Sequence, residues 1–380
     1  MTSFTLGEIV LYFLRLGTFG FGGPIALVGY MQRDLVETRR WFDLKEYKEG
    51  LALAQLAPGP LAAQLAIYLG WLRHGVLGAT LVAVAFVLPS FLMVMALSAA
   101  YVAYGGIDWM QGAFYGIGAA VIAIIARSAF KLTKGTLGGD RLLWVLFTAS
   151  AVVTAWTESE VIWLFLLCGV VMLLAGTRTR AVPVRATTLA VLPLWLVTGL
   201  AGPASRDILW KIGTRFAEAG AFVFGSGLAI VPFLHGTVVN QLGWLTERQF
   251  LDAVAVAMIT PGPVVITVAF IGYLVAGPLG GTVAAFGVFL PCYLLVVIPA
   301  RYFRRAVHDP RVKAFVDGVT AAAAGAIAGA AFVLGRHAIH DVPTALIALA
   351  TLVALPRITS SAEPLLIVGA GVAGIILTTS

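Results

Sequence analysis

Charged residues are scarce in this chain. Of its 380 residues, 11% are charged and 60% are hydrophobic, and the mean hydropathy is +0.96. A soluble domain carries about 25% charged residues. The composition therefore predicts an integral membrane protein embedded in the lipid bilayer, with little room for a separate soluble domain.

Other features are missing as well. The two cysteines, Cys168 and Cys292, lie far apart in apolar segments, which argues against a disulfide and indicates small buried side chains. No nucleophile–base set and no metal-binding spacing appears, and Gly17 to Gly22 does not follow a strand as a nucleotide-binding loop would. We therefore expect no enzyme activity, no cofactor and no metal. The start of the chain lacks a basic segment and a cleavage site, so no signal peptide is expected.

The basic residues show no nucleic-acid patch. The net charge is +7, but the lysines and arginines are scattered over short loops. This distribution favours the positive-inside bias of membrane proteins. We expect no nucleic-acid partner.

Apolar runs recur along the whole chain, and a spanning helix needs about 20 such residues. The pattern predicts six segments, a connector and six more segments. Their approximate ranges are 7–31, 50–71, 75–99, 110–130, 141–156, 161–175, 187–201, 213–235, 251–275, 279–300, 314–334, 342–356 and 364–379.

The two halves resemble each other at an offset of 203 positions. Identities at this offset include Phe13 with Phe216 and Trp41 with Trp244. The sequence thus predicts an internal duplication: 1–185 as the N-terminal membrane repeat, 186–205 as a connecting transmembrane helix, and 206–380 as the C-terminal repeat.

Each half carries two interruptions of its apolar runs. The first half has Gly20-Phe21-Gly22-Gly23-Pro24 and Pro58-Gly59-Pro60, and the second has Gly225-Ser226-Gly227 and Pro261-Gly262-Pro263. Proline removes a backbone donor and clashes with the preceding turn, so continuous helices are excluded there. In a membrane, broken helices are tolerated where they are buried in protein or line a cavity, and paired breaks in two halves indicate a transport site.

The breaks can bind an anion. Proline suits the first helical position, so Pro24, Pro60 and Pro263 each start a half-helix, and Ser226 can cap a fourth before Gly227. Helix starts present unpaired N–H groups and about half a positive charge. Nearby side chains that can add donors are Thr18, Gln55, Gln64, Ser226, Thr260 and Thr267. The alternative is that these glycines and prolines only allow close helix packing and kinks.

Ionisable residues inside apolar segments are costly and hence functional candidates. Arg15 could hold an oxyanion, and Glu218, its counterpart in the second repeat, could carry a coupling proton; a mutual ion pair is the alternative. Asp252 and Asp317 could bind protons or serve as interfacial or capping residues. His235, at a segment end, is expected to be solvated.

The topology has two interpretations. If all 13 segments span, the 24 loop lysines and arginines divide 15 to 9 between the two sides. If the first two segments of each half are re-entrant hairpins, they divide 19 to 5, which the positive-inside rule prefers. In both interpretations the halves have opposite orientations, so we expect inverted repeats.

These motifs resemble those of the chromate ion transporters (the CHR family) in its two-domain form. The resemblance rests on Phe19 to Pro24, Ala54 to Pro60, Phe222 to Gly227 and Thr260 to Pro263. It implies antiparallel halves, chromate export across the bacterial inner membrane, chromate resistance, and sulfate as a structural analogue. The family's motif residues fall on Gly22, Gly23, Pro24, Pro58, Gly59, Pro60, Gly225, Gly227, Pro261, Gly262 and Pro263.

We therefore expect an all-α inverted-repeat secondary transporter for a tetrahedral oxyanion. A sulfate importer or exchanger, an anion channel and a membrane scaffold remain alternatives. The Gly- and Ala-rich face from Ala321 to Ala331 is compatible with a homodimer or with packing inside one chain.

Overall fold

The chain folds into helices throughout the part that the structure describes. The structure is a computed structural model, and it describes residues 4–21, 23–104, 108–157, 162–176, 205–222, 230–306, 310–358 and 363–379. No strand occurs within these ranges, so the predicted all-α class is confirmed. The predicted connecting helix lies outside the described residues except for Ser205, as do Gly22, Gly225, Ser226 and Gly227.

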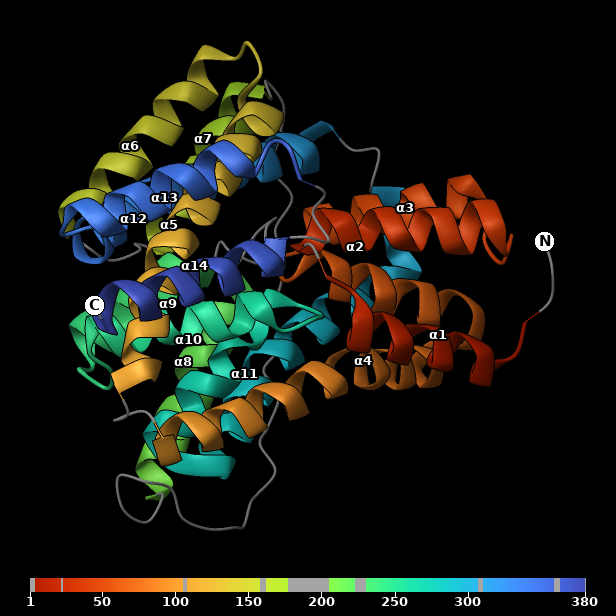
Figure 1. Ribbon diagram of the computed structural model, residues 1–380. Helices are drawn as coiled ribbons and strands as arrows, with labels where there is room; N and C mark the ends of the chain where they lie inside the picture. The colour runs from red at the N-terminus through yellow and green to blue at the C-terminus, as the bar shows by residue number, and fades with distance from the viewer. Residues whose placement is uncertain are drawn as a thin grey trace.

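The two halves contain the same series of helices (Figure 1). The first half has α1 Leu6–Phe19, α2 Gly23–Met31, a π-helix Gln32–Thr38, α3 Leu44–Leu56, α4 Leu61–Tyr104, α5 Asp108–Leu137, α6 Arg141–Thr157 and α7 Ile162–Gly176. The second half has α8 Arg206–Phe222, α9 Ile230–His235, a π-helix Gly236–Gln241, α10 Glu247–Ile259, a 3₁₀ turn Val264–Ile266, α11 Thr267–Ala306, α12 Pro310–Ala338, α13 Val342–Ala354 and α14 Glu363–Thr379.

Helices α3 and α10 show how closely the halves correspond. Both have 13 residues, and their first residues, Leu44 and Glu247, are 203 positions apart. Each begins with a capping box, in which the side chain of Asp43 or Thr246 accepts a hydrogen bond from the N–H of the third helical residue. The local signals that start this helix were therefore kept in both halves, as the predicted duplication requires.

A kink divides the longest helix of each half. In α4 the helical geometry fails at His74 and Gly75, and in α11 it fails at Ala276 and Gly277. The two glycines have φ values of 57° and 63°, which side chains with a Cβ rarely adopt. The predicted segment boundary near 71–75 is thus confirmed as a bend.

Four helices are long and apolar enough to cross a bilayer. They cover Leu61–Tyr104, Trp109–Lys134, Val264–Ala300 and Ala314–Arg336. Two lie in each half at equivalent places, and shorter apolar helices accompany them. Together with the composition, these helices make the chain a multi-pass membrane protein.

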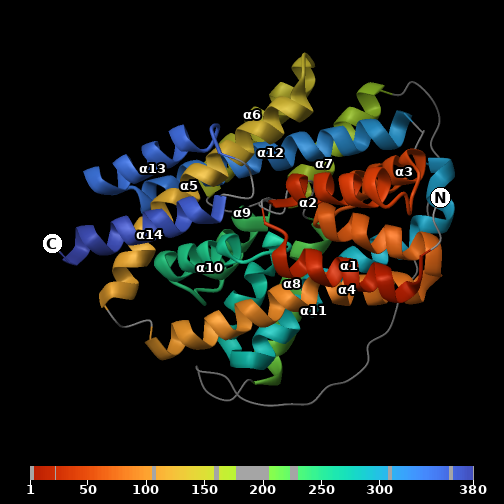
Figure 2. The ribbon, with the colours of Figure 1, turned by 45° about the vertical axis from the view of Figure 1, so that its right-hand side comes forward.

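Equivalent helices of the two halves make reciprocal contacts with each other (Figures 1 and 2). Helix α5 packs against α14 and α7 packs against α12, which are equivalent pairs with the halves exchanged. The same holds for α6 with α12 and α13 with α5, while α4 contacts its own counterpart α11. Such reciprocity is the signature of a two-fold relation. The two halves are therefore joined by reciprocal helix contacts, with α4 against α11.

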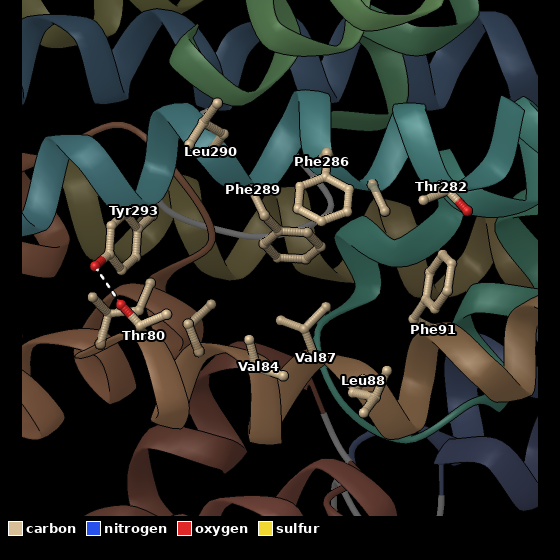
Figure 3. A pocket seen from close by; sticks show the side chains of 14 residues that line it. Thr80, Val84, Val87, Leu88, Phe91, Thr282, Phe286, Phe289, Leu290 and Tyr293 are labelled. Carbon is tan, nitrogen blue, oxygen red and sulfur yellow. Dashed lines mark hydrogen bonds between the residues drawn. The ribbon is translucent and has the colours of Figure 1, made fainter. Parts of the chain in front are cut away.

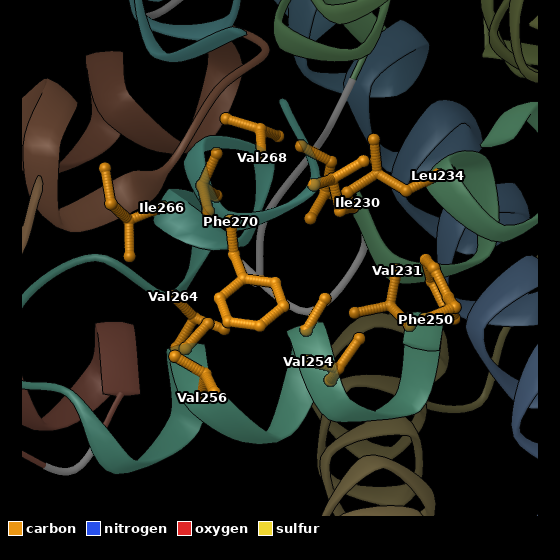
Figure 4. Close-up of a cluster of buried hydrophobic side chains, with 14 of the residues drawn as sticks. Ile230, Val231, Leu234, Phe250, Val254, Val256, Val264, Ile266, Val268 and Phe270 are labelled. Atoms are coloured by element: carbon orange, nitrogen blue, oxygen red, sulfur yellow. The ribbon is translucent and has the colours of Figure 1, made fainter. Parts of the chain in front are cut away.

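The largest apolar core surrounds the second Pro-Gly-Pro loop (Figure 4). Ile230, Val231, Phe250, Val254 and Phe270 are fully buried there, and the close-up shows them converging from α9, α10 and α11. Interiors of this kind are close-packed and resist rearrangement. The loop at the end of α10 is consequently held on a rigid support.

Candidate functional site

The first break separates α1 from α2. Helix α1 ends at Phe19, and the N–H of Gly20 donates to the carbonyl of Leu16 at 2.7 Å. Helix α2 begins at Gly23, so Pro24 is its second residue. Pro24 therefore lies one position later than predicted but still within the first turn, which proline suits because the N–H groups there have no partner within the helix.

The Pro-Gly-Pro loops form the second break in each half. Helix α3 ends before Ala57 and α10 before Thr260, and the helical chain resumes at Leu61 and Val264. All loop residues are buried except Pro58, which is half-buried. These breaks lie inside the protein, as a membrane protein requires of irregular backbone.

Pro60 and Pro263 lie one position earlier, relative to the helices that follow them, than the sequence predicts. The carbonyl of Pro60 accepts the N–H of Gln64 at 3.0 Å, and Pro263 has an extended ψ of 121°. Both residues therefore precede the helix as caps and do not form its first turn. Proline constrains φ alone, so its ring fits either position.

The loop glycines could not be replaced without strain. Gly59 and Gly262 have φ values of 137° and 93°. A Cβ on Gly59 would lie 2.5 Å from Nε2 of Gln64, and one on Gly262 would lie 2.0 Å from Oγ of Ser90. Both the backbone conformation and the packing thus require glycine.

A backbone hydrogen bond joins the two halves at the breaks. The N–H of Gly262 donates to the carbonyl of Gly20 at 2.9 Å. The second Pro-Gly-Pro loop therefore touches the end of α1 beside the first break. The structure thus brings the second Pro-Gly-Pro loop and the first break together, although they are far apart in the sequence. In this arrangement the N–H of Gly262 already donates to Gly20.

The predicted polar donors lie at the loops but bond to their own backbone. Gln64 is fully buried, and its Nε2 donates to the carbonyl of Pro58, while its Oε1 has no protein partner in the described chain. Thr267, the counterpart of Gln64, donates to the carbonyl of Val264 at 2.8 Å, and Thr260 donates to that of Ala257 at 3.1 Å. These side chains stabilise the loops in this conformation.

Other predicted residues include Gln55, in the last turn of α3 two residues before Ala57, and Arg15 on α1. Gln55 and Arg15 are exposed, and no hydrogen bond or ion pair between described residues joins Arg15 to the loops. Glu218 pairs with Arg215 on its own helix at 3.0 Å. The alternative of an Arg15–Glu218 ion pair is therefore wrong, because a partner three residues away satisfies the carboxylate locally.

Of the candidate proton sites, Asp252 is deeply buried. The hydroxyl of Tyr101, on α4 of the other half, donates to its carboxylate at 2.7 Å. Arg248 lies one turn earlier on α10. Asp317 is half-buried on α12. Tyr101 was missed in the sequence because a tyrosine in an apolar run carries no signal of a polar contact.

His235 is buried, whereas the sequence predicts a solvated side chain. Its side chain is 3% exposed, and its Nε2 lies 2.8 Å from a carboxylate oxygen of Glu247. The ring also meets Phe250 edge-on. This pair joins the end of α9 to the start of α10. The prediction failed because residues 12 positions apart in sequence meet only through the intervening turn.

A groove lies between α4 and α11, with a volume of about 380 Å³ (Figure 3). Its lining is apolar apart from Thr80, Thr282 and Tyr293, and the hydroxyls of Thr80 and Tyr293 bond to each other at 2.7 Å. An oxyanion needs donors or positive charge in place of its water shell. This groove therefore is not the predicted oxyanion site.

The fold and the breaks define a class of protein. The chain is a duplicated, multi-pass α-helical membrane protein whose helices are interrupted by an equivalent, largely buried Pro-Gly-Pro loop in each half. It belongs to the chromate transporter family, which matches residues 7–173 and, a second time, residues 210–375. The double match confirms the internal duplication.

Relatives cover nearly the whole chain. A chromate transport protein of Cupriavidus metallidurans is 58% identical over 98% of this chain and 94% of its own length. A probable chromate transport protein of Synechococcus elongatus is 55% identical over 98% and 96%. The chromate transport protein of Pseudomonas aeruginosa is 32% identical over 89% and 83%. No solved structure matches this chain.

Proposed function

We propose that this chain is a secondary transporter that exports chromate across the bacterial inner membrane by alternating access. The observation that carries the proposal is the hydrogen bond from Gly262 to Gly20, which links the broken helices of the two halves. The names of the relatives, with identity up to 58% across 98% of the chain, support chromate as the substrate.

The anion binds at the starts of the half-helices. The first N–H groups of α2 and α4, and of the chain after Pro263, have no partner within their helices. The helix dipoles add partial positive charge at these points, and burial strengthens its effect on a dianion. A tetrahedral dianion can take several such donors at once, which a kink for packing alone would leave unused.

The hydrogen bond from the N–H of Gly262 to Gly20 supports two states of the anion site, one with this bond and one without it. While this group donates to Gly20, it cannot donate to an anion. We infer that substrate binding exchanges this bond for one to the anion and separates the two elements. A ligand that binds one arrangement better shifts the population toward it, which is the requirement for alternating access.

The repeats are inverted, and their broken segments are re-entrant hairpins. Helix α3 and the part of α4 before its kink at His74 and Gly75 have 13 residues each. Each part spans about 20 Å, less than the bilayer core of about 30 Å. Two such helices joined by Pro-Gly-Pro fit a hairpin that enters and leaves on one side. The reciprocal packing and the unequal loop charges support the inverted relation of 1–185 to 206–380.

Asp252 is the proposed site of the coupling proton. It is the most buried of the three acidic candidates, whereas Glu218 is part of an ion pair with 42% side-chain exposure. A buried carboxylate that bonds to Tyr101 across the two halves can change its protonation as they move. Asp317 remains a second candidate on α12.

The test uses purified protein in detergent and in proteoliposomes. We expect chromate and sulfate, but not chloride at equal ionic strength, to raise the unfolding temperature, since ligands stabilise the state they bind. Pro60→Leu should lose this effect, whereas Pro343→Leu, at the start of an ordinary helix, should keep it. Equal responses to all anions contradict the site. Sulfate uptake without chromate transport indicates an importer or exchanger, and large uncoupled currents indicate a channel.

A further inference from the structure

Two buried side chains occupy the same place in the two repeats. Ser90 on α4 and Cys292 on α11 are fully buried. The hydroxyl of Ser90 donates to the carbonyl of Gly17 at 3.4 Å. The sulfur of Cys292 lies 3.3 Å from the carbonyl oxygen of Gly220 and 3.0 Å from that of Val288 in its own helix, and its thiol can donate to either. The two side chains therefore make the same contact with α1 and α8, respectively.

The carbonyls of Gly17 and Gly220 can be reached because the helices pack closely at these glycines. A Cβ on Gly17 would lie 2.3 Å from the carbonyl oxygen of Phe86, and one on Gly220 would lie 2.2 Å from that of Val288. Glycine is thus required for α1 to meet α4, and for α8 to meet α11, at this distance. Ser90 lies one turn beyond Phe86 and reaches the exposed glycine carbonyl.

The same side chains support the loops of the opposite repeats. A Cβ on Gly262, in the second repeat, would lie 2.0 Å from Oγ of Ser90 in the first. A Cβ on Gly59, in the first repeat, would lie 2.9 Å from Sγ of Cys292 in the second. Each Pro-Gly-Pro loop therefore rests directly on a side chain from the other half.

We propose that Ser90 and Cys292 are positioning residues that hold the Pro-Gly-Pro loops, each from the opposite repeat. Each side chain lies between a glycine carbonyl of its own repeat and the loop glycine of the opposite repeat. A shift of α4 against α1 must then disturb the loop of the second repeat, and the equivalent shift in the second repeat disturbs the first loop. Each loop therefore depends on how the helices of the opposite repeat pack. A hydroxyl is a stronger donor than a thiol, so the halves hold their loops unequally.

The kinetic test rests on the proposed function, because it measures chromate transport in proteoliposomes. Ser90→Ala and Cys292→Ala should raise KM by about threefold to tenfold, the effect of one lost hydrogen bond, with Vmax changed less than about twofold. Ser90→Cys and Cys292→Ser should restore KM to within about twofold, since both keep a donor. Ser98→Ala is the matched control: Ser98 is also fully buried on α4 but donates to Val94 in its own helix.

A second test does not depend on transport. In a Cys168→Ala background, Cys292 is the sole thiol, and its alkylation by N-ethylmaleimide reports whether the first loop covers it. Pro60→Leu, in the loop that rests on Cys292, should speed alkylation by about threefold or more through local opening. Pro263→Leu, in the other loop, should not. With Ser90→Cys and Cys292→Ser added, the two proline variants should exchange their effects.

The outcomes separate the two proposals. Alanine variants that fold as the wild type does and keep its KM would overturn the positioning role, as would equal effects of Ser98→Ala. Equal alkylation rates in the two proline variants would also overturn it. A wild-type protein that moves no chromate would overturn the proposed function, while the alkylation pattern would still decide the contact between repeats.

Discussion

The hydroxyl of Tyr101 donates to the carboxylate of Asp252 at 2.7 Å and joins α4 of the first repeat to α10 of the second. The ring of Tyr101 is held edge-on by Phe114 and Phe270. A buried carboxylate is costly unless it is hydrogen-bonded, so this bond stabilises the ionised form of Asp252. Any movement that separates the repeats here breaks this bond and changes the surroundings of the carboxylate.

Asp252→Asn should therefore uncouple transport from the proton gradient. We expect chromate counterflow, which needs no gradient, to persist in proteoliposomes, while gradient-driven transport falls at least about tenfold. Tyr101→Phe should reduce the free energy of unfolding by about 1 kcal/mol through the lost hydrogen bond. Tyr104→Phe, with an exposed ring near the same helix end, is the control. Gradient-driven transport that survives Asp252→Asn would exclude this carboxylate.

Gly262→Ala should impair transport more than it impairs insertion. The new methyl group would overlap Oγ of Ser90 in a backbone region that L residues avoid, and should cost about 1–3 kcal/mol. We expect normal membrane insertion with chromate transport reduced at least about tenfold, measured in vesicles at matched protein amounts. Gly118→Ala on α5, where a Cβ would meet open space, should behave as the wild type. Equal transport by the two variants would contradict a tightly packed loop.

Asp341 should stabilise the start of α13 in a pH-dependent way. Hydrogen bonds from Tyr115 and then Thr344 lower the pKa of Asp341 from 3.8 to about 2. Because its pKa is lower in the folded state, its ionic contribution is present above about pH 4 and is lost as the pH falls toward 2. Asp341→Ala should cost about 1 kcal/mol at pH 7, the usual value of a helix cap, and less near pH 3.

Thermal unfolding of the purified protein measures this effect. Asp207→Ala is the control, because Asp207 forms an exposed ion pair with Lys211 within one helix. A destabilisation by Asp341→Ala that stays constant from pH 7 to pH 3 would show that its charge has no part.

The His235–Glu247 contact should stabilise the link between α9 and α10. Glu247→Gln leaves a buried imidazole with a weaker partner and should cost about 1–3 kcal/mol of unfolding free energy. Asp34→Asn, which removes an ion pair with an Arg33 side chain that is 61% exposed, should cost less than about 1 kcal/mol. Thermal or denaturant unfolding distinguishes the two. Equal costs would show that the His235–Glu247 contact contributes no more to stability than an exposed ion pair does.

Much of the helical pattern could be predicted from local signals. The Pro-Gly-Pro interruptions, the boundary near His74 and the duplication follow from residue types and spacing, because proline and glycine restrict the backbone at their own positions. Side-chain partners were less predictable. Glu218 could be assigned to Arg15 by repeat symmetry, yet it bonds to Arg215, since the nearer partner on the same helix needs less ordering.

The sequence by itself determined the membrane class, the family, the two repeats and the places where their helices break. Only the tertiary structure decided that Gly262 bonds to Gly20, that Tyr101 bonds to Asp252, and that each loop rests on Ser90 or Cys292 of the opposite repeat. The physical reason is the distance along the chain over which each effect acts. Composition and proline act on the nearest few residues, whereas these contacts join residues up to 242 positions apart and depend on how the helices cross.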